Sequence, residues 1–409
     1  RDIVSFLRQG SSDSGNPCAG DVEYAYAFGV SQSGRVLRQF LHLALNRDQE
    51  GRVVFDGFIS HVAGGKRGEF NQRFAQPSSQ ASRSTNSLFP FSDTDQTDPE
   101  TELTDGLLTR LAAQGPLPKI MYVSTPSEYW GGHGALVHTD LTGNRDLDSP
   151  EAVRIYIMGG MQHAVGGLPL ADIDAEGVRT QQLFHCLDYR PLLRAALVNM
   201  DRWVTSGQAA PPSQHPTLGD GTAVSPETVF KTLETIPGVK APAHLRRFTR
   251  LDFGPNPDVP TNIPPKIGGL YPNLVSAVDG DGNETSGIRM PYITVPLATY
   301  TGWNLRHSGI GGGGEIMSTG GSSGGTLKGS TIPFPATAEE RQAAGDPRLS
   351  VEERYGSKEG YLSKIEEAAQ GMVDEGYLLS EDVATVMEHA SQLYEAFAGR
   401  VREVQAADN

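Results

Sequence analysis

Cysteine, basic residues and long apolar runs are all scarce in this chain of 409 residues. The two cysteines, Cys18 and Cys186, are too few for a cysteine metal cage and form no CxxC pair. They are therefore either two buried thiols or one disulfide of an exported protein. No apolar run approaches the roughly 18 to 20 residues that a bilayer helix needs, so we expect no membrane span. The segment from Arg1 to Arg8 is typical of an amphipathic helix and lacks the apolar region of a signal peptide.

Acidic residues outnumber basic ones, and the formal net charge is −15. A surface of this sign repels phosphate backbones and anionic lipids, so we expect no nucleic-acid partner. Glycine and proline, by contrast, are abundant, with 48 and 27 residues. They indicate long irregular segments around a core that is still sizeable. The length fits one large domain with additions, or two or three smaller domains.

Short apolar runs alternate with longer amphipathic stretches from Glu23 onward, which is the pattern of a parallel sheet with crossover helices. The candidate strands run over residues 23–28, 53–60, 119–125 and 153–158. Apolar residues at helical spacing predict a helix over 34–46, directly after the first strand. A second helix is predicted over 190–205, with Pro191 at its start and Gly207 just beyond its end. The predicted fold class is therefore α/β.

Composition divides the chain into three regions. Residues 1–207 contain the alternating strands and helices and form the predicted core. Residues 208–347 are rich in Pro and Gly, so we expect an insertion-like region of irregular excursions packed on that core. Residues 348–409 are helical again, and an apolar stripe in the last helix predicts packing or subunit contact.

The strongest chemical signal is the hexapeptide GVSQSG at positions 29–34, which lies between an apolar strand and a helix. This is the context of the nucleophile elbow G-x-S-x-G, in which a strained turn exposes the serine. The turn requires small residues two positions before and after the serine, and these are Gly29 and Ser33. Ser33 departs from the usual glycine but is small, and Gly34 follows at once. We predict Ser31 as the nucleophile.

A nucleophilic serine needs a base, and the base needs an orienting acid. In α/β-hydrolases the chain order is Ser, then Asp or Glu, then His, with the last two on loops after later strands. Glu128 follows the candidate strand that ends at Thr125, and His163 follows the next one. We therefore predict a triad of Ser31, Glu128 and His163. The competing residues are Glu69, which also follows a candidate strand, together with His61, His133, His138 and Asp140.

In such a triad His163 takes the Ser31 proton during attack on an acyl carbon, Glu128 holds the imidazole tautomer, and water releases the acyl group. We expect one oxyanion donor from the backbone N–H of Gln32. The second donor should come from the loop after the third strand of the sheet, for which this chain offers no candidate. We therefore expect a companion chain that supplies the N-terminal half of the sheet, or else a truncated reading frame.

Other motifs predict neither a cofactor nor a metal site. The segment 279–284 resembles a calcium loop, but its glycine comes too early and the closing acid is missing, so we interpret it as a turn. Residues 311–330 contain no nucleotide-binding G-x-x-x-x-G-K-[ST]. The literal G-x-S-x-G matches at 320–325 lack a preceding strand and a following helix, so we interpret them as flexible loop.

Several segments together resemble the large bacterial α/β-hydrolase-domain proteins. They are GVSQSGR at 29–35, QH at 162–163, LDYRP at 187–191, PLATYTGWN at 296–304 and DPRLS at 346–350. The resemblance covers nearly the whole chain, although family members carry a long segment with four strands ahead of the elbow. It implies an α/β-hydrolase fold and a serine hydrolase, usually exported, with Ser31, Glu128 and His163 as the triad.

The expected reaction is hydrolysis of a carboxylic ester in a small molecule or a polymer. An amidase or peptidase with the same triad is an alternative, because leaving-group preference depends on the pocket. A non-catalytic binding subunit that lacks half its oxyanion hole is another. The acidic charge, the possible disulfide and the resemblance favour an extracellular or periplasmic location.

Overall fold

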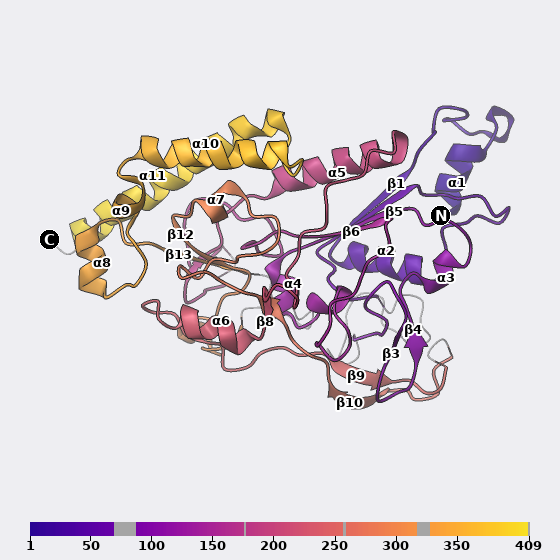
Figure 1. Cartoon of the computed structure of the whole chain (residues 1–409), viewed down its shortest axis with the longest axis horizontal. Coiled ribbons are helices and arrows are strands. Elements are labelled where there is room, and N and C mark those ends of the chain that lie inside the picture. Colours follow the sequence, from indigo (N-terminus) through magenta and orange to yellow (C-terminus); the bar gives the residue numbers. More distant parts are fainter. Residues whose placement is uncertain (69–86, 176, 257–258, 317–327, 408–409) are drawn as a thin grey trace.

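A parallel four-stranded sheet forms the centre of the computed structural model (Figure 1). The structure describes residues 1–68, 87–175, 177–256, 259–316 and 328–407. The strand order is β1-β2-β5-β6, with β1 at Tyr26–Val30, β2 at Gly57–His61, β5 at Lys119–Ser124 and β6 at Val153–Ile157. All four strands were predicted, and their parallel pairing confirms the α/β class. Their carboxyl ends therefore meet at one edge of the sheet.

Helices cover both faces of this sheet. On one face α2 (Gln32–His42) packs through Leu41 against Phe58 and Ile120. On the other face α5 (Arg190–Thr205) packs through Met200 and Trp203. The α5 bounds are those predicted, but α2 ends at His42 instead of residue 46. The reason is local, because Ala44 has a positive φ of 52° and cannot continue a right-handed helix.

The first region also contains short elements around the sheet. They are α1 (Asp2–Gln9), β3 (Gln96–Thr97), β4 (Thr104–Asp105), α3 (Thr109–Ala112), α4 (Pro126–Trp130) and β7 (Leu183–Phe184). The amphipathic helix predicted at the start of the chain corresponds to α1. Cys18 and Cys186 are both free thiols, so the disulfide alternative is absent; Cys186 is buried and Cys18 is half-buried.

The Pro- and Gly-rich region contains more paired backbone than its composition indicates. Its elements are β8 (Ala223–Val224), α6 (Pro226–Leu233), β9 (Thr249–Asp252), β10 (Lys266–Leu270), β11 (Val275–Ser276), α7 (Pro291–Thr294), β12 (Ala298–Thr301) and β13 (Ser330–Pro333). The order β12-β13-β7 joins this region to the first one. Gln214 also forms a parallel bridge to Tyr156 of β6, and Ile288 forms one to Met158, which directly follows β6. The region is thus attached to the sheet at several points.

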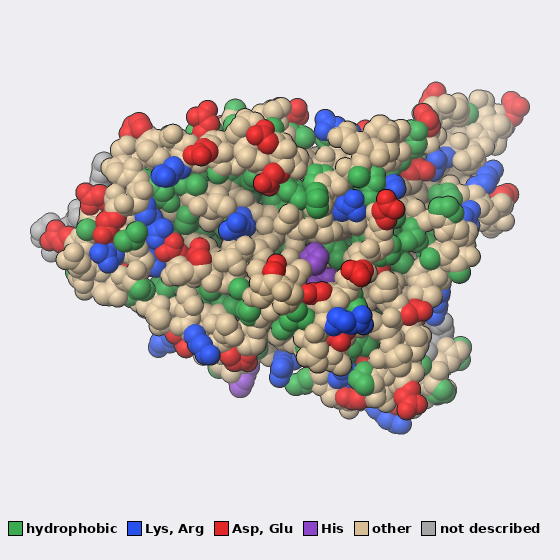
Figure 2. Space-filling model, in the orientation of Figure 1, with side chains coloured by type: hydrophobic (Ala, Val, Ile, Leu, Met, Phe, Trp, Pro, Cys, Tyr) green, Lys and Arg blue, Asp and Glu red, His purple; other side chains and the backbone are tan. Residues whose placement is uncertain are grey.

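The tail consists of α8 (Ala338–Ala344), α9 (Val351–Tyr355), α10 (Lys358–Asp374) and α11 (Val383–Ala407). Figure 2 shows acidic side chains gathered on the surface of this tail, at the top of the view. The predicted apolar stripe of α11 lies inside, since Val386, Ala390 and Leu393 are fully buried. Among the residues that the structure describes, no helix has the length and apolarity to cross a membrane.

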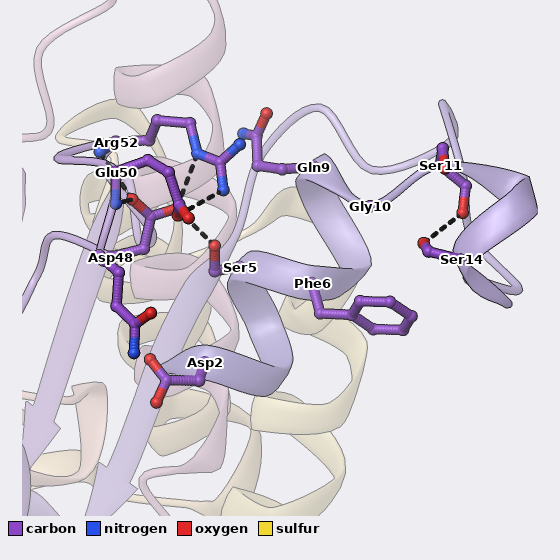
Figure 3. A pocket seen from close by; sticks show the side chains of 11 residues that line it. Asp2, Ser5, Phe6, Gln9, Gly10, Ser11, Ser14, Asp48, Glu50 and Arg52 are labelled. Atoms are coloured by element: carbon purple, nitrogen blue, oxygen red, sulfur yellow. Dashed lines mark hydrogen bonds and ion pairs between the residues drawn. The ribbon is translucent and has the colours of Figure 1, made fainter.

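A surface hollow of about 470 Å³ lies between α1 and the turn at residues 48–52 (Figure 3). Asp48 accepts hydrogen bonds there from Ser5 and Arg52, at 2.6 Å and 2.8 Å. None of the predicted triad residues lines this hollow. Its polar groups bind one another and fix α1 to the body of the molecule.

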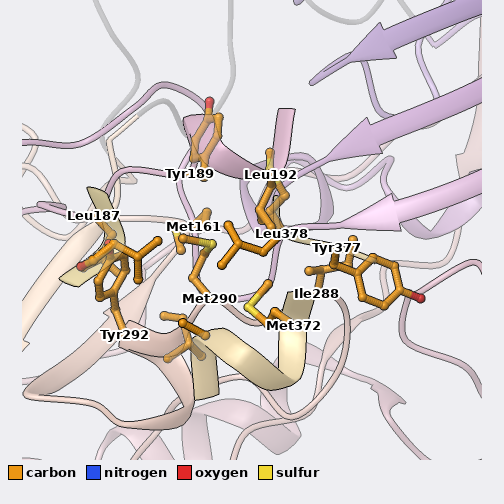
Figure 4. Close-up of a cluster of buried hydrophobic side chains, with 14 of the residues drawn as sticks. Met161, Leu187, Tyr189, Leu192, Ile288, Met290, Tyr292, Met372, Tyr377 and Leu378 are labelled. Carbon is orange, nitrogen blue, oxygen red and sulfur yellow. Dashed lines mark hydrogen bonds between the residues drawn. The ribbon is translucent and has the colours of Figure 1, made fainter. Parts of the chain in front are cut away.

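One buried cluster contains side chains of all three regions (Figure 4). Met161 and Leu192 come from the first region, Met290 from the second, and Met372 and Leu378 from the tail. The hydroxyl of the buried Tyr292 also donates to a backbone carbonyl of α11, at 3.1 Å. The three regions therefore share a core.

Candidate active site

Ser31 lies in the sharp turn between β1 and α2. Its φ of 52° and ψ of −110° are unusual for a residue with a side chain, and such strain is typical of functional sites. The Ser31 N–H donates to the carbonyl of His61 at 2.8 Å, which fixes the turn to the neighbouring strand β2. The strained turn and the strand contact together hold the serine at the carboxyl edge of the sheet.

The two glycines of the hexapeptide lie where neighbouring backbone is closest. A Cβ on Gly29 would lie 2.6 Å from the carbonyl oxygen of Ser33. A Cβ on Gly34 would lie 2.9 Å from the carbonyl oxygen of His61. Ser33 itself is exposed, so its side chain is accommodated without a clash. The close contact with β2 therefore falls at Gly34, and this explains why serine is tolerated at position 33.

The structure brings Ser31, His163 and Glu128 into one hydrogen-bonded row. His163 Nε2 lies 3.0 Å from Ser31 Oγ, and His163 Nδ1 lies 2.6 Å from Glu128 Oε1. With Nδ1–H donating to the carboxylate, Nε2 is left to accept the serine hydroxyl proton. His163 follows β6, as predicted, whereas Glu128 lies in the short helix α4 and not in an open loop.

Glu128 is held by the start of its own helix. Its Oε2 accepts the backbone N–H and the hydroxyl of Thr125, both at 2.8 Å, in a capping box. Burial of Glu128 would by itself raise the pKa of its carboxyl. The hydrogen bonds from His163 and Thr125 outweigh burial, so the net effect lowers this pKa. The carboxylate is therefore ionised at neutral pH and can stabilise a histidine cation.

Two of the three competing histidines, His61 and His138, form hydrogen bonds elsewhere. His61 is buried at the end of β2, and its Nδ1 donates to the carbonyl of Val123 at 3.1 Å. His138 Nε2 lies 2.6 Å from the Tyr129 hydroxyl. Burial lowers the pKa of His61, His133 and His138, which keeps them neutral at physiological pH.

Asp140, the competing acid that the structure describes, does not displace Glu128. Asp140 lies in a turn, where its Oδ1 accepts the backbone N–H of Asn144 at 2.8 Å. Glu69 falls outside the described residues, as do the literal G-x-S-x-G matches at 320–325. Within the described residues it is therefore Glu128 that orients His163.

Gln32 is the first residue of α2 and directly follows the candidate nucleophile. Backbone N–H groups at a helix N-terminus have no partner within the helix and favour negative charge. This position suits an oxyanion donor, which is the role predicted for Gln32.

The segment 279–284 forms a turn in which Asp279 Oδ1 accepts the N–H groups of Asp281 and Asn283, both at 2.9 Å. Sequence patterns missed what its last residue does. Glu284 is buried, and its Oε2 accepts the backbone N–H of Gly160, in the loop that carries His163, at 3.0 Å. Burial raises the pKa of Glu284 to about 8. In the part of the chain that the structure describes, no group of three or more potential ligands suits a metal ion.

The alpha/beta hydrolase domain family matches residues 1–388 of the chain. The chain belongs to this family. No curated protein and no solved structure matches it. Membership in the alpha/beta hydrolase domain family indicates a hydrolase, and it agrees with the parallel sheet and with the strained turn at Ser31 between a strand and a helix.

Proposed function

We propose that this hydrolase cleaves carboxylic esters through an acyl-enzyme formed on Ser31. The observation that carries the proposal is the continuous row from Ser31 Oγ through His163 to Glu128, with distances of 3.0 Å and 2.6 Å. A serine on a strained turn, a histidine within reach of its hydroxyl, and a buried carboxylate behind the histidine are the parts that nucleophilic acyl transfer needs.

Each group has a defined task in this reaction. His163 Nε2 removes the hydroxyl proton as Ser31 Oγ attacks the ester carbonyl, and the Glu128 carboxylate stabilises the resulting imidazolium. His163 then returns the proton to the leaving alcohol. A water molecule activated by the same histidine releases the carboxylic acid and restores the serine.

The negative oxygen of the tetrahedral intermediate needs two donors, and Gln32 N–H supplies the first. We assign the second to a companion chain that pairs with the outer edge of β1. Within the described residues β1 pairs only with β2, while Phe28 and Val30 are 52% and 45% exposed. An unpaired apolar strand edge of this kind is a template for another strand.

Labelling with a fluorophosphonate tests the proposal directly. We expect the purified protein to react, with the label mapped to Ser31, and the Ser31→Ala variant to remain unlabelled. Absence of label on the folded wild type would favour the non-catalytic binding subunit instead. Intact mass and native mass of the labelled material then show whether a second chain accompanies this one, and a lone active chain would contradict the companion.

Matched ester and amide substrates with the same acyl group separate the two enzymatic alternatives. We expect the ester to be hydrolysed at least tenfold faster in kcat/KM. An equal or faster rate on the amide would assign the protein as an amidase or peptidase that uses the same three residues.

A further inference from the structure

We infer that Ser127 and Tyr189 are positioning residues that hold the backbone of His163 in register with Ser31 and Glu128. The inference rests on the proposed function, because it assigns a role relative to His163 as general base. It concerns two side chains for which the sequence motifs predicted no role, although Tyr189 lies in the LDYRP segment at 187–191. Both act through His163 without contacting the reacting atoms.

Ser127 holds the amide side of His163. The backbone N–H of His163 donates to Ser127 Oγ at 2.9 Å, and the Ser127 hydroxyl in turn donates to the carbonyl of Gly302 at 2.7 Å. Ser127 is buried, with 2% of its surface exposed, so water does not replace these bonds readily. The hydroxyl therefore links the histidine loop to the end of β12.

Tyr189 holds the carbonyl side of the same residue. Its hydroxyl donates to the backbone carbonyl of His163 at 2.8 Å. The ring is buried immediately before α5 and packs edge-on against His61, with 5.6 Å between ring centroids. Both backbone polar groups of His163 are thus bonded to side chains from other elements.

Helix α4 binds His163 through two hydrogen bonds. Ser127 binds its backbone N–H, and the next residue, Glu128, binds its imidazole Nδ1. Because the two contacts come from adjacent residues of one short helix, the backbone and the ring of His163 are held in one frame. A displacement of about 1 Å at a reacting group can cost about 100-fold in rate, so this frame has a direct consequence for catalysis.

The Pro- and Gly-rich region supports this arrangement by packing against α4. Gly302 packs so tightly on α4 that a Cβ would lie 2.6 Å from Pro126 Cβ and 2.7 Å from Ser127 N. Its carbonyl is the acceptor that orients the Ser127 hydroxyl. The segment at 296–304 therefore contributes to the position of the base, although it supplies none of the three reacting side chains.

The test compares each positioning residue with a matched residue of the same type. Ser127→Ala is paired with Ser330→Ala, because the buried Ser330 hydroxyl also donates to a carbonyl, that of Trp303, at 2.7 Å. Tyr189→Phe is paired with Tyr292→Phe, whose buried hydroxyl donates to the carbonyl of Val386 at 3.1 Å. In the described structure the hydrogen bonds of His163 go to other residues than these controls.

We expect Ser127→Ala and Tyr189→Phe each to lower kcat on a p-nitrophenyl ester by about 10- to 100-fold, with KM unchanged within about twofold. The rate of fluorophosphonate labelling should fall in parallel, and the acidic limb of the kcat–pH profile should shift. Both controls should keep kcat within about twofold. Melting temperature is measured for all four, because a purely structural hydroxyl would lower it equally within each pair and spare kcat.

The possible failures can be told apart. If the folded wild type neither reacts with fluorophosphonate nor hydrolyses the ester, the proposed function fails. If the wild type is active and the variants match their controls in kcat and pH profile, the positioning roles are overturned. Should Ser127→Ala not fold, Tyr189→Phe decides the matter, because it removes one oxygen atom and preserves the ring.

Discussion

The two halves of the candidate triad are built in different ways. Ser31 is positioned by local structure: β1 ends at Val30, α2 begins at Gln32, and the Ser31 N–H donates to the carbonyl of His61 in β2. His163 lies in a loop whose position depends on Ser127, Tyr189 and Glu284. The proposed nucleophile is therefore positioned by neighbouring residues, and the proposed base by contacts between distant ones.

This difference decides which kinds of substitution each half tolerates. On the nucleophile side the sensitive groups are backbone atoms, and the limiting property is the space around glycine. On the base side the sensitive groups are buried polar side chains, and the limiting property is whether each hydrogen bond is satisfied. The following predictions test the comparison, from the largest expected effect to the smallest.

Removing the Ser31 hydroxyl or the His163 imidazole should have the same large effect. We expect Ser31→Ala and His163→Ala each to lower kcat by about 10³- to 10⁶-fold, and the double variant to be no worse than either single one. The physical reason is that neither group acts without the other. Multiplicative losses in the double variant, measured by ester hydrolysis, would show that the two halves act independently.

Adding one methyl group at Gly34 should disrupt the turn that positions Ser31. We expect Gly34→Ala to lower the free energy of unfolding by about 2 to 4 kcal/mol and to abolish labelling, since the new Cβ meets backbone oxygens of His61 and Gly29 at 2.9 Å and 3.0 Å. The control is Gly371→Ala, a helical glycine in α10 with open space around it. This control should be more stable by about 0.5 to 1 kcal/mol. Equal urea midpoints for the two variants would contradict the account.

The free energy of unfolding should depend on pH through Glu284, which binds the loop that carries His163. Burial raises its pKa to about 8, so between its ordinary value of 4.5 and 8 the folded protein retains a proton that the unfolded chain releases. Stability from this group therefore falls as pH rises through that window. Glu284→Gln keeps an acceptor for the Gly160 N–H and removes the titration.

We expect Glu284→Gln to gain stability over the wild type on the order of 2 kcal/mol at pH 8, with little difference at pH 4.5. Urea unfolding at the two pH values measures this. A gain that is the same at both values would mean that Glu284 does not titrate in this range.

Restoring the usual elbow motif should change almost nothing. We expect Ser33→Gly to keep kcat within about twofold and to cost about 0.5 to 1 kcal/mol of stability, because glycine is less favourable than serine in a helix. Ester kinetics and thermal unfolding check both numbers. A tenfold change in kcat would assign the Ser33 side chain a role that its exposed position does not suggest.

Sequence patterns predicted the regular part of the molecule well. The four central strands and α5 follow from apolar periodicity, and α5 begins at the predicted residue and ends at about the predicted position. The elbow context indicated Ser31, and chain order indicated Glu128 and His163, which the structure brings within hydrogen-bond distance. The end of α2 was wrong by four residues, because a single positive φ at Ala44 leaves no mark in periodicity.

The supports of the base were invisible in the sequence for a physical reason. Ser127 and Gly302 are 175 residues apart. No sequence pattern identifies the hydrogen-bond partner of a serine hydroxyl or of a backbone carbonyl. Glu284 looked like the end of a turn, because nothing local shows that it is buried beside Gly160. The role of Gly302 likewise becomes evident only from its packing against α4.

The link from Ser127 to Gly302 also sets an order of events during synthesis. Chains grow at roughly 5 to 20 residues per second, so the 175 residues between the two are added in roughly 9 to 35 seconds. Throughout that interval a nascent chain already carries Ser31, yet the carbonyl that orients Ser127 has not been made. If the proposed function holds, the protein becomes competent for catalysis late in translation, long after Ser31 has left the ribosome.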